Sequence, residues 1–172
     1  MTFARTLLIG AAAVALNTAA ASAADLLTPV PITEASLFDF EGFYLGATAG
    51  LATSGSLYGN FGVVAGNNFA VTDGIIAGVE FQLSGYFAGG GLVAYDALAL
   101  GRVGGFISDN TMLYGELGVG LLDGSAAYAF GGGVEMAMTD SLAIRGELQG
   151  LGEFGSGVSV GKATAGLIWH MN

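Results

Sequence analysis

The sequence predicts an all-β protein, an eight-stranded antiparallel up-and-down barrel that crosses a membrane. Three observations lead to this prediction. Of the 172 residues, 53 % are hydrophobic and only 10 % are charged. From Glu41 onward, apolar residues recur at every second position, which is typical of strands with two different faces. The few charged residues of these segments fall on the opposite rows, so one face of each strand carries no charge.

Composition excludes several classes of protein. The 31 Gly residues follow no strict three-residue period, which excludes collagen, and the apolar fraction is too high for intrinsic disorder. Because Cys is absent, neither a disulfide framework nor a Cys nucleophile is expected. A formal net charge of −10 offers little to bind phosphates, so nucleic acid is not an expected partner. The length suits one domain.

Residues 1–23 are expected to form a secretory signal peptide. Arg5 supplies the positive start, residues 7–16 form a short apolar core, and residues 21–23 are small enough for cleavage. The alternative, a transmembrane helix, requires roughly 20 apolar residues and does not fit this core. Cleavage would leave only three Lys and Arg residues against 14 Asp and Glu residues.

Residues 24–40 are expected to be a periplasmic N-terminal leader, followed by the barrel domain at 41–172. The leader contains both prolines of the chain, Pro29 and Pro31, and shows no clear hydrophobic period. A segment of this kind is extended rather than helical or strand-forming.

Eight runs of alternating residues are expected to be the strands, each with an uncharged apolar row. They lie at 43–51, 61–69, 75–83, 95–103, 113–121, 128–136, 142–148 and 163–171. The second run is the weakest, because Asn67 lies in its apolar row and would meet lipid unless it is near the membrane rim. In hydrocarbon a sheet edge cannot stay unpaired, so the strands must close into a ring.

The links between these runs are of two kinds. Short polar turns, each with one Asp, lie at 71–74, 108–111 and 138–141. Links rich in Gly and Ser lie near 53–60, 87–94, 122–126 and 153–159, which predicts outer loops of about five to eight residues. An even number of strands places both termini and the polar turns on the periplasmic side, and the Gly/Ser links outside.

Aromatic residues are expected at the two membrane interfaces, where barrels carry girdles of such side chains. Phe43, Phe69 and Trp169 would lie at the periplasmic rim. Phe61, Tyr95 and Tyr128 would lie at the outer rim. The alternative is that aromatic residues are present only because they favour strands.

Several short motifs resemble the small OmpA-like outer-membrane barrels of alphaproteobacteria, a family often labelled "porin". The motifs are spread over residues 40–171: Phe40–Gly46 with Gly50, Gly78–Glu80, Gly101–Gly104, Leu113–Tyr114 with Gly118, Gly133–Glu135 with Thr139–Asp140, and Gly166–Trp169. The sequence departs from the family pattern at Phe40, which replaces a usual Trp, and at Gln82, where an acidic residue is frequent. The chain also ends in His170-Met171-Asn172 rather than with a terminal aromatic residue.

The resemblance implies a place in the outer membrane of a Gram-negative bacterium. It also implies insertion by the barrel assembly machinery and surroundings of outer-membrane lipid and lipopolysaccharide. A monomer is expected.

An eight-stranded barrel is just wide enough for side chains to fill it, so the charges opposite the apolar rows are expected to form a buried ion network. The set consists of Glu80, Arg102, Glu116, Glu135, Arg145, Glu147 and Lys162. Leaving one such charge unpaired would cost about 3–5 kcal/mol, so the charges should pair and the lumen should be plugged. The alternative is an ion-conducting path through the barrel.

No catalytic, cofactor-binding or metal-binding residues are expected, and the protein is not expected to be an enzyme. Some outer-membrane barrels of this size are hydrolases with a Ser/His/acid set. Here the single histidine, His170, lies on an inward row as the third residue from the end, with no Ser paired to it in sequence. The expected function is therefore a structural barrel that supports the envelope, and the alternatives are surface recognition and a narrow channel.

Overall fold

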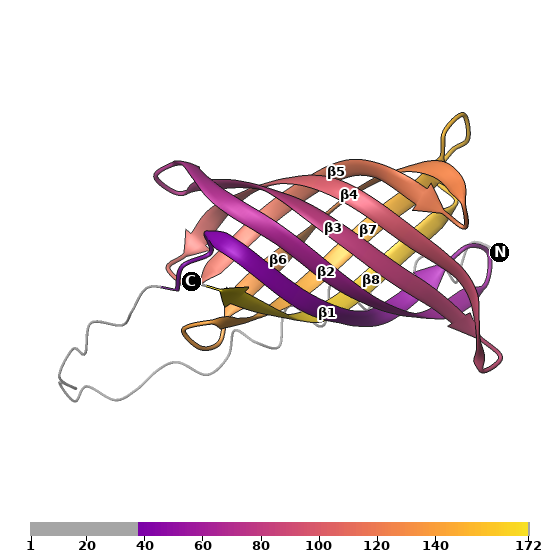
Figure 1. The fold of residues 1–172 in the computed structure, drawn as a ribbon, viewed down its shortest axis with the longest axis horizontal. Coiled ribbons are helices and arrows are strands. Elements are labelled where there is room, and N and C mark those ends of the chain that lie inside the picture. Colours follow the sequence, from indigo (N-terminus) through magenta and orange to yellow (C-terminus); the bar gives the residue numbers. More distant parts are fainter. Residues whose placement is uncertain (1–37, 172) are drawn as a thin grey trace. The chain divides into compact units, whose positions relative to one another are not determined.

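The computed structural model describes residues 38–171, and they form a closed antiparallel barrel of eight strands (Figure 1). The strands are β1 (Gly42–Thr53), β2 (Leu57–Thr72), β3 (Ile75–Ala88), β4 (Gly91–Ser108), β5 (Thr111–Leu122), β6 (Ser125–Ala137), β7 (Leu142–Glu153) and β8 (Val160–Met171). Each strand pairs with the next, and β8 pairs back with β1, from Phe43 opposite Met171 to Thr53 opposite Gly161. The predicted fold class is confirmed.

The expected signal peptide and residues 24–37 of the expected leader lie outside the described residues. Within the described part of the chain, no helix has the length and hydropathy needed to cross a membrane.

The two ends of the barrel differ in what they carry. The terminal end holds the start of β1, the end of β8 and the connections at 73–74, 109–110 and 138–141. It lies on the left in Figure 1. The loop end, on the right, holds the connections at 54–56, 89–90, 123–124 and 154–159. The polar turns expected from the sequence therefore all lie at the terminal end, and the Gly/Ser links lie at the opposite end.

The expected length of five to eight residues was wrong for three of the four loop-end links, because strands continue into them. Three of the four connections have only two or three residues, and the fourth has six. β2 and β4 reach 16 and 18 residues, since residues such as Leu57 and Leu92 continue the ladder to the neighbouring strand. At 89–90 the tight turn is possible because both residues are Gly with positive φ, 60° and 87°.

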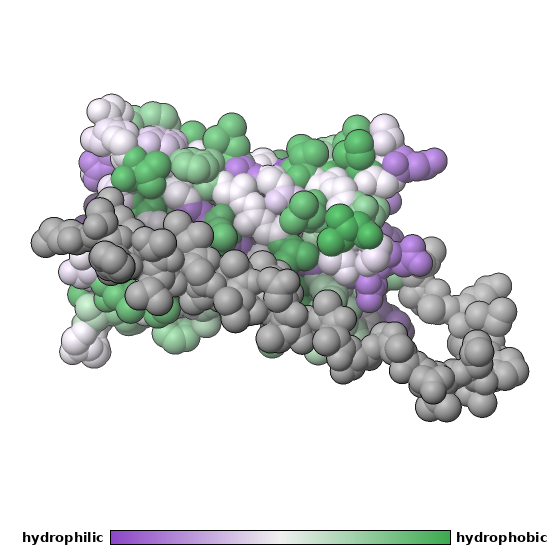
Figure 2. All heavy atoms as spheres, turned by 180° about the vertical axis from the view of Figure 1, so that it is seen from behind, coloured by the Kyte–Doolittle hydropathy of each residue, from purple (hydrophilic) through white to green (hydrophobic). Residues whose placement is uncertain are grey.

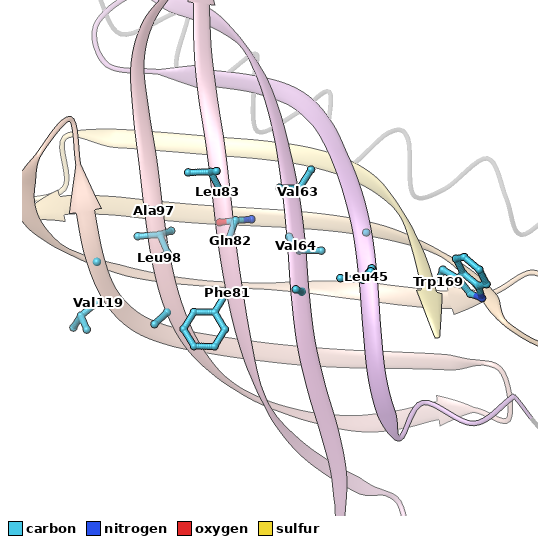
Figure 3. Close-up of a pocket in the computed structure, with 14 residues that line it drawn as sticks. Leu45, Val63, Val64, Phe81, Gln82, Leu83, Ala97, Leu98, Val119 and Trp169 are labelled. Atoms are coloured by element: carbon cyan, nitrogen blue, oxygen red, sulfur yellow. The ribbon is translucent and has the colours of Figure 1, made fainter. Parts of the chain in front are cut away.

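The outer wall of the barrel is apolar, the reverse of a soluble protein. Many large side chains on the outward rows are exposed, with Phe43 at 67 % and Leu117 at 68 %. Figure 2 shows hydrophobic residues along the visible wall and hydrophilic ones gathered toward the ends. In Figure 3, outward residues such as Leu45, Phe81 and Trp169 line an open apolar hollow on this wall. An apolar band of this kind is the surface that a transmembrane barrel presents to lipid.

The weak point of the second strand is resolved by its position. Asn67 does lie on the outward row of β2, where it is half-buried. It is the register partner of Phe43, the second residue of β1, so it lies near the terminal end rather than in the middle of the wall.

Inward-pointing glycines make room for large side chains in the narrow lumen. A Cβ on Gly133 would lie only 2.6 Å from the hydroxyl oxygen of Tyr114, and a Cβ on Gly66 would collide with the ring of Tyr44. The glycine run at 131–133 therefore permits a close approach inside the barrel. These pairs position two tyrosines that belong to the interior network described below.

Two apolar layers close the lumen, one toward each end. The layer at the terminal end contains Phe38, Phe40, Tyr44, Val64, Ile76, Met112, Tyr114, Ala143 and Ile168. The layer at the loop end contains Ala52, Tyr86, Leu98, Leu100, Leu122, Ala127, Ala129, Leu151 and Val160. The charged side chains lie on the same inward rows, and along β4 Leu98 and Leu100 lie between Asp96 and Arg102. Because Phe38 and Phe40 pack into the first layer, the last residues of the expected leader are part of the barrel's interior.

Candidate functional site

The structure places all seven charges of the expected network inside the barrel. None of them is more than 6 % exposed. They come from the inward rows of β3 to β8, so strand alternation alone directs them to the lumen. They divide into two groups with different partners.

The first group, which we call the arginine cluster, is built on Glu80, Arg102, Glu135 and Arg145. Arg145 bonds Glu80 through Nη1 (2.7 Å) and Glu135 through Nε (3.0 Å). Arg102 reaches the same two carboxylates, with Nη1 3.0 Å from Glu80 Oε2 and Nη2 3.4 Å from Glu135 Oε2. Each carboxylate is thus shared by two guanidinium groups, and each guanidinium group bridges two carboxylates.

Two tyrosines extend the arginine cluster. The Tyr44 hydroxyl donates to Glu80 Oε2 (2.6 Å) and accepts from Arg102 Nη1 (2.7 Å). The Tyr114 hydroxyl donates to Glu147 Oε2 (2.6 Å), and its ring lies 3.9 Å from the guanidinium carbon of Arg102. A guanidinium group is attracted to the face of an aromatic ring, so stacking on Tyr114 stabilises the charge of Arg102 in addition to its carboxylate partners.

His170 joins the arginine cluster from the last strand. Its Nε2 lies 2.7 Å from Glu135 Oε1, and its ring stacks on Tyr44 with the ring centroids 5.4 Å apart. It is 1 % exposed. The residue considered as a possible general base is therefore held by a carboxylate that already bonds two arginines.

Three carboxylates, those of Glu80, Glu116 and Glu147, bring oxygen atoms within 4.8 Å of one another. This grouping could hold a metal ion, but a cation already lies in it. The Nη1 atom of Arg145 is 2.7 Å from Glu80 and 3.8 Å from Glu147. The guanidinium group of Arg145 therefore takes the place that a metal ion between these two carboxylates would need.

The second group, the lysine cluster, lies closer to the loop end. Lys162 Nζ bonds Asp96 Oδ2 (3.1 Å) and donates to Gln82 Oε1 (3.0 Å) and Ser84 Oγ (3.4 Å). The Tyr86 hydroxyl donates to the same oxygen of Asp96. Here one cation faces one carboxylate, and neutral groups complete the shell.

Gln82 connects the two clusters. Its Oε1 accepts from Lys162, while its Nε2 donates to Glu147 Oε1 at 3.4 Å. An amide can make both bonds at once because it carries a donor and an acceptor. A carboxylate, which the resemblance leads one to expect here, could only accept.

Carboxylates outnumber cations in the lumen. Among the described residues, five buried carboxylates share it with three Lys and Arg side chains. Neutral donors make up part of the difference: Tyr44, Tyr86, Tyr114 and Gln149 each donate to a carboxylate. Glu116, for example, is bonded by Gln149 Nε2 at 2.6 Å.

Several members of the network were missed by sequence reasoning. Asp96 lies on the same inward row of β4 as Arg102, and Tyr44, Tyr86 and Tyr114 lie on inward rows of β1, β3 and β5. The sequence did contain a signal for them, because they occupy the same alternate positions as the inward-facing residues of their strands. The tyrosines were not predicted to be in the network, because an aromatic residue in a barrel strand is first assigned to the outer wall.

The aromatic residues expected at the interfaces lie on the outside of the barrel, near its ends. Toward the terminal end, Phe43, Phe69 and Trp169 are 67 %, 51 % and 59 % exposed. Toward the loop end, Phe61 is 62 % exposed and Tyr95 39 %. Tyr128 is half-buried and donates to the carbonyl of Ser156 at 3.2 Å. Their role at a membrane interface stays a prediction.

An apolar wall around a closed ring of strands, with every described Lys and Arg side chain inside, defines a transmembrane β-barrel. No family model matches the sequence, and no curated protein matches it.

Solved structures do share the fold. One is a de novo designed transmembrane β-barrel, with a TM-score of 0.53 and 17 % identity over 76 % of this chain and 97 % of that chain. Neisserial surface protein A has a TM-score of 0.51 and 15 % identity, covering 76 % of this chain and 98 % of that chain. The Yersinia pestis outer membrane protein Ail in a phospholipid nanodisc has a TM-score of 0.50 and 14 % identity, over 75 % and 99 %. The predicted resemblance to small membrane barrels thus holds at the level of the fold.

Proposed function

We propose that this protein is a structural barrel of the bacterial outer membrane that supports the integrity of the envelope without conducting ions. The observation that carries the proposal is the filled lumen. Two groups of buried ion pairs lie on the same inward rows as the side chains of two apolar layers. A solute would have to break these pairs in order to pass, at a cost of about 3–5 kcal/mol for each buried charge left alone.

The loop end supports this role over surface recognition. Three of its four connections have two or three residues, and they offer few of the aromatic or Arg anchors that dominate binding energy. Recognition would have to rest on the connection at 154–159, which carries the exposed side chains of Phe154 and Val158. Lipid and lipopolysaccharide would surround the wall, the barrel assembly machinery would insert the chain, and the protein would act as a monomer.

The test combines location, conductance and the effect of deletion. We expect the protein in the outer-membrane fraction, with a gel mobility that changes on boiling because the closed barrel resists detergent until it is heated. Cells without the protein should take up a hydrophobic dye faster than cells in which the gene is restored. Purified protein should give no steady openings in planar bilayers. Steady openings would favour the channel, and an unchanged barrier with lost binding to other cells would favour recognition.

A further inference from the structure

The segment that precedes the first strand closes one end of the lumen. Residues 38–41, which we call the strap, include the last three residues of the expected leader and lead into β1. Phe40 is 1 % exposed and Phe38 is 9 % exposed, although neither belongs to a strand. Their rings meet edge to face with centroids 4.6 Å apart. The strap therefore folds into the barrel rather than continuing outward from β1.

The turn into the strap is set by Gly42. This residue has φ 85°, a conformation that residues with a Cβ rarely adopt. Because the chain changes direction at the first residue of β1, the strap crosses the opening instead of extending the wall. The glycine required by this turn is the one that follows Phe40-Glu41 in the sequence.

The strap touches three strands of the ring, β2 and β8 on either side of β1, and β4 two places beyond β1's neighbour β2. On β2, Asn68 Nδ2 donates to the carbonyl of Phe40 (2.9 Å), and the amide of Ala70 donates to Glu41 (3.3 Å). On β4, the ring of Phe106 lies 5.5 Å from that of Phe40. On β8, the contact is with His170. Contacts with separate strands hold the strap across the opening.

His170 connects the strap to the arginine cluster. Its ring lies 4.9 Å from that of Phe38 and 5.8 Å from that of Phe40, both nearly perpendicular. Its Nε2 is bonded to Glu135, whereas its buried Nδ1 has no hydrogen-bond partner among the described residues. Without the strap, water would reach Nδ1 and then the carboxylates and guanidinium groups behind it.

We propose that the strap is a lid, closed in this structure, whose release opens the ion network to water and small solutes from the terminal end. The rings of the strap belong to the terminal-end layer, whereas Leu98, Leu100 and Leu151 belong to the loop-end layer, so we expect release to hydrate the lumen without creating a pore. The proposal depends on the barrel fold and not on the envelope role, so either can fail while the other stands.

The chain's single histidine makes the lid directly measurable. Diethyl pyrocarbonate modifies unprotonated imidazole nitrogen, and mass spectrometry of untagged, folded protein reports its reaction at His170. In the wild type we expect slow modification. In the Phe38→Ala/Phe40→Ala variant we expect a rate higher by an order of magnitude or more, because a side chain in a closed core reacts only after local opening. Phe43→Ala is the matched control, since Phe43 lies on the outer wall and its loss leaves the lid intact.

Two milder variants keep the test decisive if the double variant does not fold. Asn68→Ala removes the side-chain hydrogen bond to Phe40, and Gly42→Ala opposes the turn into the strap. Folding is checked in each case by the change of gel mobility on boiling. Fast modification of His170 in the wild type, or continued protection in the folded variants, would overturn the proposal.

Discussion

The arginine cluster and the lysine cluster solve the same problem in different ways. Both hold buried cations inside the barrel. In the arginine cluster, two guanidinium groups and two carboxylates are each bonded twice, so every charge depends on several others. In the lysine cluster, Lys162 and Asp96 form one pair that neutral Gln82, Ser84 and Tyr86 complete. The difference indicates that the first cluster acts as a unit, whereas the second can be altered one pair at a time.

The largest effect is expected from Arg145→Ala. This change removes the bonds to Glu80 and Glu135 and leaves both carboxylates buried with only Arg102 to balance them. We expect a loss of about 3–5 kcal/mol in the free energy of unfolding, measured by urea titration of protein folded in lipid vesicles. Arg145→Lys should recover only part of the loss, because an ammonium group does not reproduce the planar fork of Arg. A variant as stable as the wild type would contradict the cluster's dependence on shared charges.

Arg102→Ala is expected to be next in size. Its bonds to Glu80 and Glu135 duplicate two that Arg145 also makes, and the stacking on Tyr114 is lost with it. The temperature at which the folded gel band disappears in detergent should fall, but by less than in Arg145→Ala. An unchanged temperature would count against a buried role for this residue.

The lysine cluster should respond less, and it should be repairable. Lys162→Met leaves Asp96 with no cation but with the hydroxyl of Tyr86 as a donor, so we expect a loss of about 3 kcal/mol, the low end of the range for a buried charge left alone, in the same urea titration. Adding Asp96→Asn should recover most of it, because replacing both members of a buried pair is often close to neutral. If the double variant is no more stable than Lys162→Met, the lysine cluster also acts as a unit, and the proposed difference between the two clusters is wrong.

The smallest expected effect is the coupling between the clusters through Gln82. In a double-mutant cycle of Arg102→Ala with Lys162→Met, we expect an interaction energy of about 0.5 kcal/mol or slightly more. In a Gln82→Ala background this energy should disappear, since the amide that contacts both Lys162 and Glu147 is gone. A coupling that persists would show that the clusters communicate by another route.

The direction of each side chain could be predicted from the sequence, but its partners could not. Alternation directed Glu135, Arg145 and Lys162 to the lumen, because in a strand this depends on parity alone. Partners depend on which strands face each other across a tilted ring. Arg102 lies opposite Glu116 in the strand register, yet its guanidinium group bonds Glu80 and Glu135 instead.

The strap could not be predicted from the sequence, for a different reason. Phe38 and Phe40 have the spacing of one row of a strand, but they precede a glycine whose positive φ breaks the strand pattern. Hydrophobic periodicity identifies only regular strands and helices. The strap is neither, so the sequence shows no period that would reveal its place across the opening. Similarly, the loop-end links were predicted too long because Gly and Ser usually mark loops, whereas here many of these residues pair in the ladder.

The pairing of the first strand with the last has a consequence for biogenesis. Because β1 finds its final neighbour only when β8 is present, no fragment released early in synthesis can complete the ring. Until that moment two rows of backbone donors and acceptors stay exposed, and such rows invite aggregation with other chains. We therefore expect chains truncated before Val160 to depend on periplasmic chaperones and to be degraded, with no shorter version of the protein accumulating.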